Sequence, residues 1–229
     1  MNQGGDDTRL CFFGKISIPT ILWLMKPSEP FPLSQENPMA KNAYIPSHGI
    51  RKIPNLVNFL PEYTIQKSSQ QAETVIGWGL RPTTHKARAF AQSHGLPFVA
   101  LEDGFLRSLG LGVAGYPPFA LVYDDIGIYY DTTRPSRLEQ LILEADMPSE
   151  MLSQTQQAID LILTHRLSKY NHAPDFSDGL VPDGKNIVLV IDQTFGDMAI
   201  QYGGADEATF RQMFQTALNE NPDAEIWVK

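Results

Sequence analysis

Short apolar runs alternate with helix-like stretches along most of this chain. The runs over 74–78 and 96–101 predict two strands, and residues 84–94 between them have helical spacing, with Gly95 where a helix would end. This order of strand, helix and strand predicts a βαβ unit with parallel strands. The run over 187–191 is rich in β-branched residues, which is typical of a strand buried on both faces. The pattern therefore predicts an α/β fold.

The other predicted elements follow from the same patterns. Residues 119–123 and 128–130 predict two short strands joined by a hairpin turn at 124–127. The remaining elements are helices over 136–145, 149–169 and about 206–219, and a strand over 225–228.

Changes in composition divide the chain into four parts. Residues 1–42 predict an extension and linker, with an apolar stretch over 10–25 that is shorter than the ~20 apolar residues of a spanning helix. That stretch lacks the basic start and cleavage site of a signal peptide. Residues 43–172 predict a first Rossmann-like domain, and 173–185 a polar linker. Residues 186–229 predict the start of a second such domain, truncated because the sequence stops on a strand.

Charge and cysteine content exclude several classes of protein. The net charge of −8 gives no electrostatic basis for binding nucleic acid. The single cysteine, Cys11, allows no intramolecular disulfide, which fits a cytoplasmic protein. The five histidines are scattered, and no spacing of metal ligands occurs, so we expect no metal site.

Two strand ends carry candidate chemistry. Glu102 and Asp103 directly follow the predicted strand 96–101, and Arg107 comes soon after. In open α/β sheets ligands bind beyond the carboxyl ends of the strands, where these groups would lie. A glycine-rich turn with a solvated acid pair is the alternative, and the spacing does not decide between the two.

The strand 187–191 ends in a similar way. Asp192, Gln193 and Thr194 follow it, then Asp197 and a pair of glycines. If the two strand ends face each other across one cleft, their carboxylates suit glycosyl transfer, in which one acts as acid or base and another stabilises or captures the sugar cation.

Four ordered segments then indicate a family. They are EDGFLRSLGLG (102–112), DDIGIYYDTTRPSRLE (124–139), LSKYNHAP (167–174) and DQTFGDMAIQYGGA (192–205). Together they resemble the bacterial capsule polysaccharide β-Kdo transferases of the KpsC type, within the capsule polysaccharide biosynthesis and export proteins. The opening segment HGIRKIPNLVNFL (48–60) is similar as well, so the resemblance covers roughly residues 43–229.

The resemblance implies a fold and a reaction. The fold would be GT-B, with two Rossmann-like domains around the active site. The reaction would be a retaining transfer of Kdo from CMP-Kdo, the donor substrate, with no separate cofactor. Retention would come from a double displacement with a carboxylate nucleophile or from a front-face route. The acceptor would be the growing poly-Kdo chain on lysophosphatidylglycerol, the lipid-anchored linker of the capsule. An inner-membrane capsule assembly complex is an expected partner, with the protein peripheral to that membrane.

The resemblance also suggests catalytic roles. Asp197 is the candidate nucleophile, with Asp192 as its rival and helix capping as the alternative role for Asp197. Glu102 and Asp103 are candidates for general acid or base and for positioning the acceptor.

Binding roles follow from residue type. Gln193 and Thr194 would donate hydrogen bonds to the sugar carboxylate. Arg107 would pair with a Kdo carboxylate, or alternatively form a structural salt bridge to Asp103 or Asp124. Lys169 and Asn171, expected where the long helix ends, would position the linker or line the cleft.

Two other classes of function stay open. One is another nucleotide-binding α/β enzyme, although no GxGxxG segment follows a predicted strand. The other is a non-catalytic interaction module. Binding of CMP, of a nicotinamide cofactor, or of neither would separate the three.

Overall fold

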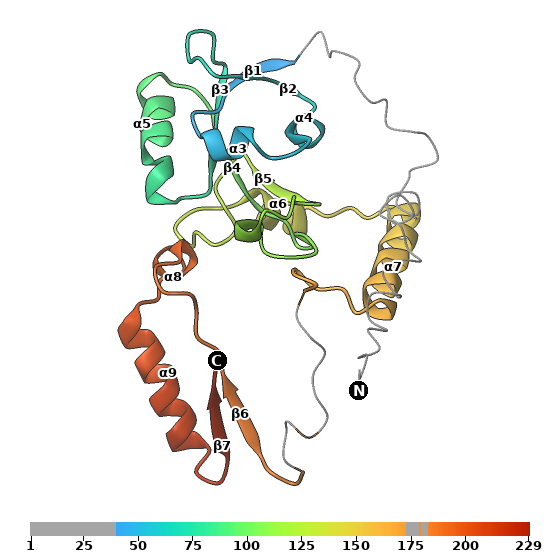
Figure 1. Ribbon diagram of the computed structural model, residues 1–229, viewed down its shortest axis with the longest axis vertical. Coiled ribbons are helices and arrows are strands. Elements are labelled where there is room, and N and C mark those ends of the chain that lie inside the picture. Colours follow the sequence, from blue (N-terminus) through green and yellow to red (C-terminus); the bar gives the residue numbers. More distant parts are fainter. Residues whose placement is uncertain (1–39, 173–178, 180–182) are drawn as a thin grey trace, which may run out of the picture. The chain divides into compact units, whose positions relative to one another are not determined.

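A five-stranded sheet organises the first part of the structure, a computed structural model that describes residues 40–172, 179 and 183–229 (Figure 1). In spatial order the strands are β2 (Tyr63–Gln66), β1 (Lys41–Tyr44), β3 (Thr74–Trp78), β4 (Phe98–Asp103) and β5 (Leu121–Asp124). The first four are parallel, and β5 is antiparallel to β4. The predicted α/β class with a mainly parallel sheet is confirmed.

The predicted βαβ unit is present. Strand β3 leads through a 3₁₀ turn, η1 (Pro82–Thr84), into α5 (His85–Ser93), and β4 then pairs with β3. Helix α5 turns its small residues Ala87 and Ala91 toward the sheet, where they pack with Val75. Gly95 has a φ of +62°, the left-handed conformation that commonly follows the last turn of a helix.

Strands β1 and β2 escaped sequence analysis, because each is only four residues long. Two short helices, α3 (His48–Arg51) and α4 (Leu56–Phe59), lie between them in the sequence. β1 begins at Lys41, so residues 41 and 42 of the predicted extension belong to the sheet. The main core forms where α3 and α4 pack against strands β1, β3 and β4. Its buried members are Ala43, Ile45, Ile50, Leu56, Leu60, Ile76, Val99 and Leu101.

The predicted hairpin over 119–130 is wrong. Only β5 forms, and residues 128–130 contain no strand, with a turn at 129–130. The buried Asp124 is the reason, since its Oδ1 atom accepts hydrogen bonds from the backbone of Ile126 (3.0 Å) and Gly127 (2.7 Å). Its Oδ2 atom accepts the backbone N–H of Arg137 (3.0 Å). One carboxylate thus turns the chain after β5 and fixes the start of the next helix.

Two helices follow β5, α6 (Arg137–Leu143) and α7 (Ser149–Thr164). A second 3₁₀ turn, η2 (Gly112–Ala114), lies between β4 and β5. α6 begins with a capping box between Ser136 and Glu139. α7 stops at Thr164, before the predicted end at residue 169, and Arg166 has a positive φ of 51°. No residue of α7 is buried, so its apolar residues do not pack in a core formed by the described residues.

The last part holds a parallel pair of strands, β6 (Ile187–Val190) and β7 (Glu225–Val228), with α8 (Met198–Tyr202) and α9 (Glu207–Glu220) between them in sequence. The predicted helix and final strand are confirmed. The expectation of a strand buried on both faces is wrong for the described chain, because Val190 is buried but Leu189 is 52% exposed. Helix α9 packs against β6, as Figure 1 shows, while Val228 of β7 is 60% exposed.

Some predictions fall outside the described residues. These are the extension up to residue 39 and most of the linker, over 173–178 and 180–182. Residues Met39–Lys229 form one compact unit, and the domain boundary stays a prediction. Among the helices that the structure describes, none has the length and apolar character to cross a bilayer.

Candidate active site

Glu102 and Asp103 are the last two residues of β4, whereas the sequence predicted them just after the strand. They continue the pairing with β5, opposite Val122 and Leu121. A strand over 119–123 was predicted, but its antiparallel pairing with β4 was not, and this pairing extends β4 by these two residues. They still lie at the carboxyl end of the parallel strands, where ligands of such sheets bind.

The Glu102 carboxyl group is held by two N–H donors on one oxygen. Its Oε1 atom accepts a hydrogen bond from the Trp78 indole Nε1 (2.8 Å) and one from the Asp103 backbone (3.2 Å). Burial raises the pKa of Glu102, and these hydrogen bonds and the charge of Arg81 only partly oppose that effect. A carboxyl group with a raised pKa suits proton exchange near neutral pH.

Gly79, just after β3, lets a tyrosine approach this carboxyl group. Its φ is +45°, and a Cβ atom placed there would lie 2.3 Å from the Tyr130 Oη and 2.8 Å from the Glu102 Oε2. The two oxygens are therefore no more than about 5 Å apart. The Tyr130 hydroxyl also accepts the backbone N–H of Leu80 (2.9 Å). Only glycine fits this conformation and this space.

Tyr129 and Tyr130 connect the two groups of predicted carboxylates. Burial, followed by the charge of Glu102 among other groups, raises the pKa of Tyr129 to about 12, and the charge of Asp197 contributes to the rise. Burial is also the largest cause of the raised pKa of Tyr130, with further contributions from Glu102 and Asp197. The same electrostatic environment thus includes Glu102 from β4 and Asp197 from the loop after β6.

A direct contact supports this proximity. The backbone N–H and the hydroxyl of Thr132 both donate to the Tyr202 carbonyl, each at 3.0 Å, and Tyr202 is the last residue of α8. Sequence analysis missed the two tyrosines as site residues because it placed them in a strand. The only signal was their position inside the segment DDIGIYYD.

Asp197 is the N-cap of α8, and its Oδ1 atom accepts the Ala199 backbone N–H at 2.9 Å. The capping geometry considered as its alternative role is therefore present. Asp192 accepts the backbone N–H of Gln193 at 2.7 Å. Gln193 and Thr194 are exposed in the same loop, so this segment remains accessible to a ligand.

Arg107 has the salt bridge to Asp103 that was its alternative role. Its Nε lies 3.0 Å from the Asp103 Oδ1, and its side chain is only 11% exposed. Its Nη1 donates to the Ser108 hydroxyl (2.9 Å) and to the Tyr116 carbonyl (2.5 Å). These contacts make Arg107 a structural brace for Asp103 in this state, while a pairing with a sugar carboxylate stays a prediction.

Lys169 and Asn171 lie beside Arg107, although not at the end of α7. The Arg107 backbone N–H donates to the Lys169 carbonyl (3.1 Å), and that of Asn171 donates to the Leu109 carbonyl (2.9 Å). Tyr170 forms a β-bridge with Ser108, and its hydroxyl is 3.5 Å from the Asp103 Oδ2. The structure thus brings the segment 169–171 beside Asp103 and Arg107, a proximity that sequence analysis did not predict.

Tyr129 also lines a surface hollow of about 520 Å³. The residues that line it are Tyr129, Asp131, Thr132, Thr133, Arg134, Pro135, Ser136 and Glu139. The residues that the structure describes contain no cluster of three or more His, Cys, Asp or Glu side chains able to hold a metal ion.

Comparison with known proteins places these features in a family. Residues 73–229 match the family described as capsule polysaccharide biosynthesis protein. The chain belongs to this family. Over 195 residues, 83% of the chain, it is 73% identical to the capsule polysaccharide modification protein LipA of Neisseria meningitidis serogroup B. It is 34% identical over 157 residues, 67% of the chain, to the lipopolysaccharide-processing protein LpsZ of Rhizobium meliloti, of which it covers 36%.

Two solved structures are similar. The β-Kdo 2,4 transferase of Thermosulfurimonas dismutans KpsC matches 83% of the chain with 42% identity and a TM-score of 0.75. The β-Kdo 2,7 transferase of the same protein matches with 27% identity and a TM-score of 0.55. The chain spans 28% of the length of LipA and 60% of each KpsC structure.

Proposed function

We propose that this chain is part of a retaining β-Kdo transferase that uses CMP-Kdo to extend the poly-Kdo linker of a lipid-anchored capsular polysaccharide. The observation that carries the proposal is geometric, in a chain 42% identical to a β-Kdo 2,4 transferase. Tyr130 lies close to Glu102 around Gly79, and the nearby Thr132 binds the carbonyl of Tyr202 in α8, the helix that Asp197 caps. The higher identity and TM-score favour a 2,4 linkage over a 2,7 linkage.

The proposed mechanism has two displacements. The Asp197 carboxylate attacks the anomeric carbon of Kdo, and CMP leaves with the electrons of the broken carbon–oxygen bond. The acceptor hydroxyl then attacks the same carbon and Asp197 leaves, while Glu102 takes the hydroxyl proton. Two inversions give retention, and two carboxylates suffice for this chemistry. Asp192 is the alternative nucleophile on the same loop.

Substrate binding is assigned to groups around these carboxylates. Gln193 and Thr194, exposed after β6, donate hydrogen bonds to the sugar carboxylate. Lys169 and Asn171 position the acidic acceptor next to Asp103 and Arg107. The anionic substrates need these donors because the chain itself carries a net charge of −8.

A chimera tests the proposal. The matching segment of N. meningitidis LipA is replaced by that of this chain, and transfer from CMP-Kdo to a short β-Kdo acceptor is followed, with native LipA as the control. We expect transfer with retained configuration, and loss of several orders of magnitude in kcat for D197A with CMP binding kept. D192A should stay active. Normal turnover by D197A would pass the nucleophile role to Asp192, and no transfer by an otherwise folded chimera beside active LipA would reject the function.

A further inference from the structure

The two oxygens of the Glu102 carboxyl group have different surroundings. Oε1 accepts both the Trp78 indole N–H and the Asp103 backbone N–H. Oε2 has no hydrogen-bond donor among the described residues and lies beside the Tyr130 hydroxyl. An oxygen that already accepts two N–H groups is a poor site for a proton, so the proton of the neutral acid belongs on Oε2.

The oxygen of the Tyr130 hydroxyl already has one hydrogen-bond partner in the protein. It accepts the Leu80 backbone N–H, and its own proton remains to be donated. Gly79 makes the approach possible, because any side chain there would occupy the space shared by the Tyr130 Oη and the Glu102 Oε2. One proton-accepting oxygen and one hydroxyl donor therefore lie within about 5 Å of each other, at the carboxyl end of β3 and β4.

We propose that Trp78 is a positioning residue that commits Oε1 of Glu102 to the protein, so that Oε2 exchanges the proton with the acceptor while the Tyr130 hydroxyl donates to the substrate. This inference rests on the proposed transferase function. It assigns the step to one oxygen: the acceptor O–H bond breaks, its electrons form the new bond to the sugar carbon, and the proton moves to Oε2. Trp78 also stabilises the charged carboxylate, which lowers the pKa of Glu102.

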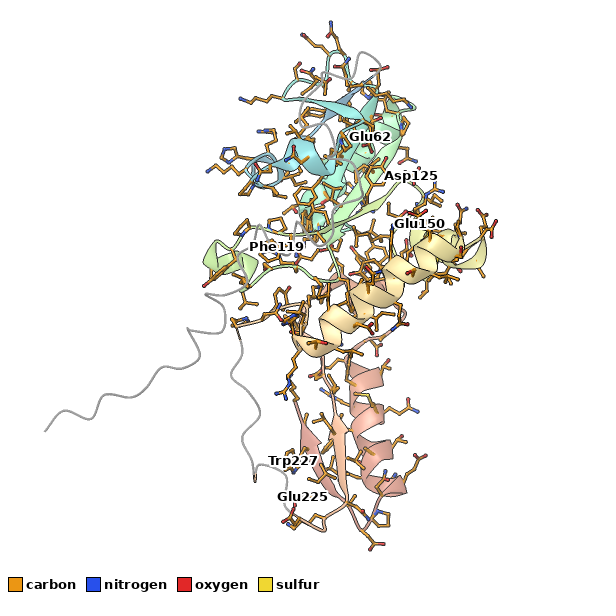
Figure 2. All side chains as sticks on the ribbon, turned by 90° about the vertical axis from the view of Figure 1, so that its right-hand side faces the viewer. Glu62, Phe119, Asp125, Glu150, Glu225 and Trp227 are labelled. Atoms are coloured by element: carbon orange, nitrogen blue, oxygen red, sulfur yellow. The ribbon has the colours of Figure 1, made fainter. Side chains whose placement is uncertain are left out.

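The chain contains a matched control for Trp78. On β7 the Trp227 indole Nε1 donates to the Glu225 Oε1 at 2.9 Å, an equivalent tryptophan–glutamate hydrogen bond on an exposed surface (Figure 2). W78F and W227F each remove one indole N–H and keep an aromatic ring. A merely structural effect of losing such a bond would appear in both variants.

Two measurements test the proposal. In the active chimera, W78F should lower kcat about 10- to 100-fold with little change in KM, because the carboxyl group loses its alignment. The limb of the pH–rate profile that reports Glu102 should move to higher pH, and Y130F should lower kcat about tenfold. W227F should change neither quantity. A fall in kcat with the limb unmoved would overturn the positioning role of Trp78.

The second measurement does not depend on turnover. In the 229-residue chain, NMR titration of the Glu102 carboxyl carbon should show a higher pKa in W78F than in the parent and W227F chains. If W78F does not fold, W78L provides the same titration measurement, because it also lacks the indole N–H. An unchanged titration would overturn the proposal. A chimera that transfers no Kdo would reject the proposed function instead, while the titration would still decide whether Trp78 acts on Glu102.

Discussion

Replacing Gly79 by alanine should destabilise the protein by about 2–4 kcal/mol. The left-handed conformation costs an alanine about 1 kcal/mol. The new methyl group would also lie 2.3 Å from the Tyr130 Oη, so the ring must move and release the Leu80 N–H that it accepts. A donor left unpaired near the core costs about 1–3 kcal/mol. For a chain of this size the sum corresponds to a fall in Tm of about 5–15 °C.

Gly95→Ala is the control for the cost of placing an alanine in the left-handed backbone conformation. Gly95 has a similar φ of +62°, but no atom lies within 4 Å of the position that its Cβ would take. We expect it to lose only the conformational term, about 1 kcal/mol. Urea unfolding followed by circular dichroism would compare the two variants with the parent chain. Equal losses would refute the reasoning, because the contact with Tyr130 would then cost nothing.

Three further substitutions have defined outcomes. E102Q should stabilise the chain at pH 7, because the pKa of Glu102 is raised in the folded protein and its charged carboxylate therefore opposes folding above the ordinary value of 4.5. The gain in the free energy of unfolding should vanish below that pH. Urea midpoints at pH 7 and pH 4 would test this, and an equal gain at both would contradict the cause. D124A should lower the free energy of unfolding by about 3 kcal/mol, because three backbone N–H groups lose their acceptor. A loss below ~1 kcal/mol in thermal unfolding would show that other groups replace these hydrogen bonds. S136A should cost about 1 kcal/mol through the α6 capping box, and calorimetry showing no change would mean that the cap is dispensable.

The sequence by itself determined the elements that depend on local patterns. The βαβ unit from β3 to β4 follows from apolar runs around an amphipathic segment, and α9 follows from its helical spacing after Asp206. The same patterns placed Glu102 and Asp103 beside the end of a strand, because the apolar run stops at Leu101, although pairing with β5 continues β4 through both residues. Several distinct segments that resemble the family, such as the one at 102–112, identified the family without any coordinates.

Only the tertiary structure decided which polar groups meet. The antiparallel β5 depends on pairing across the sheet, and the turn after it depends on a carboxylate, Asp124, that binds a backbone N–H thirteen residues later. The bond from Trp78 to Glu102 and the approach of Tyr130 to Gly79 join residues far apart in sequence. Such contacts carry no local signal, because they arise when strands and loops are packed together and not from the preference of any single segment.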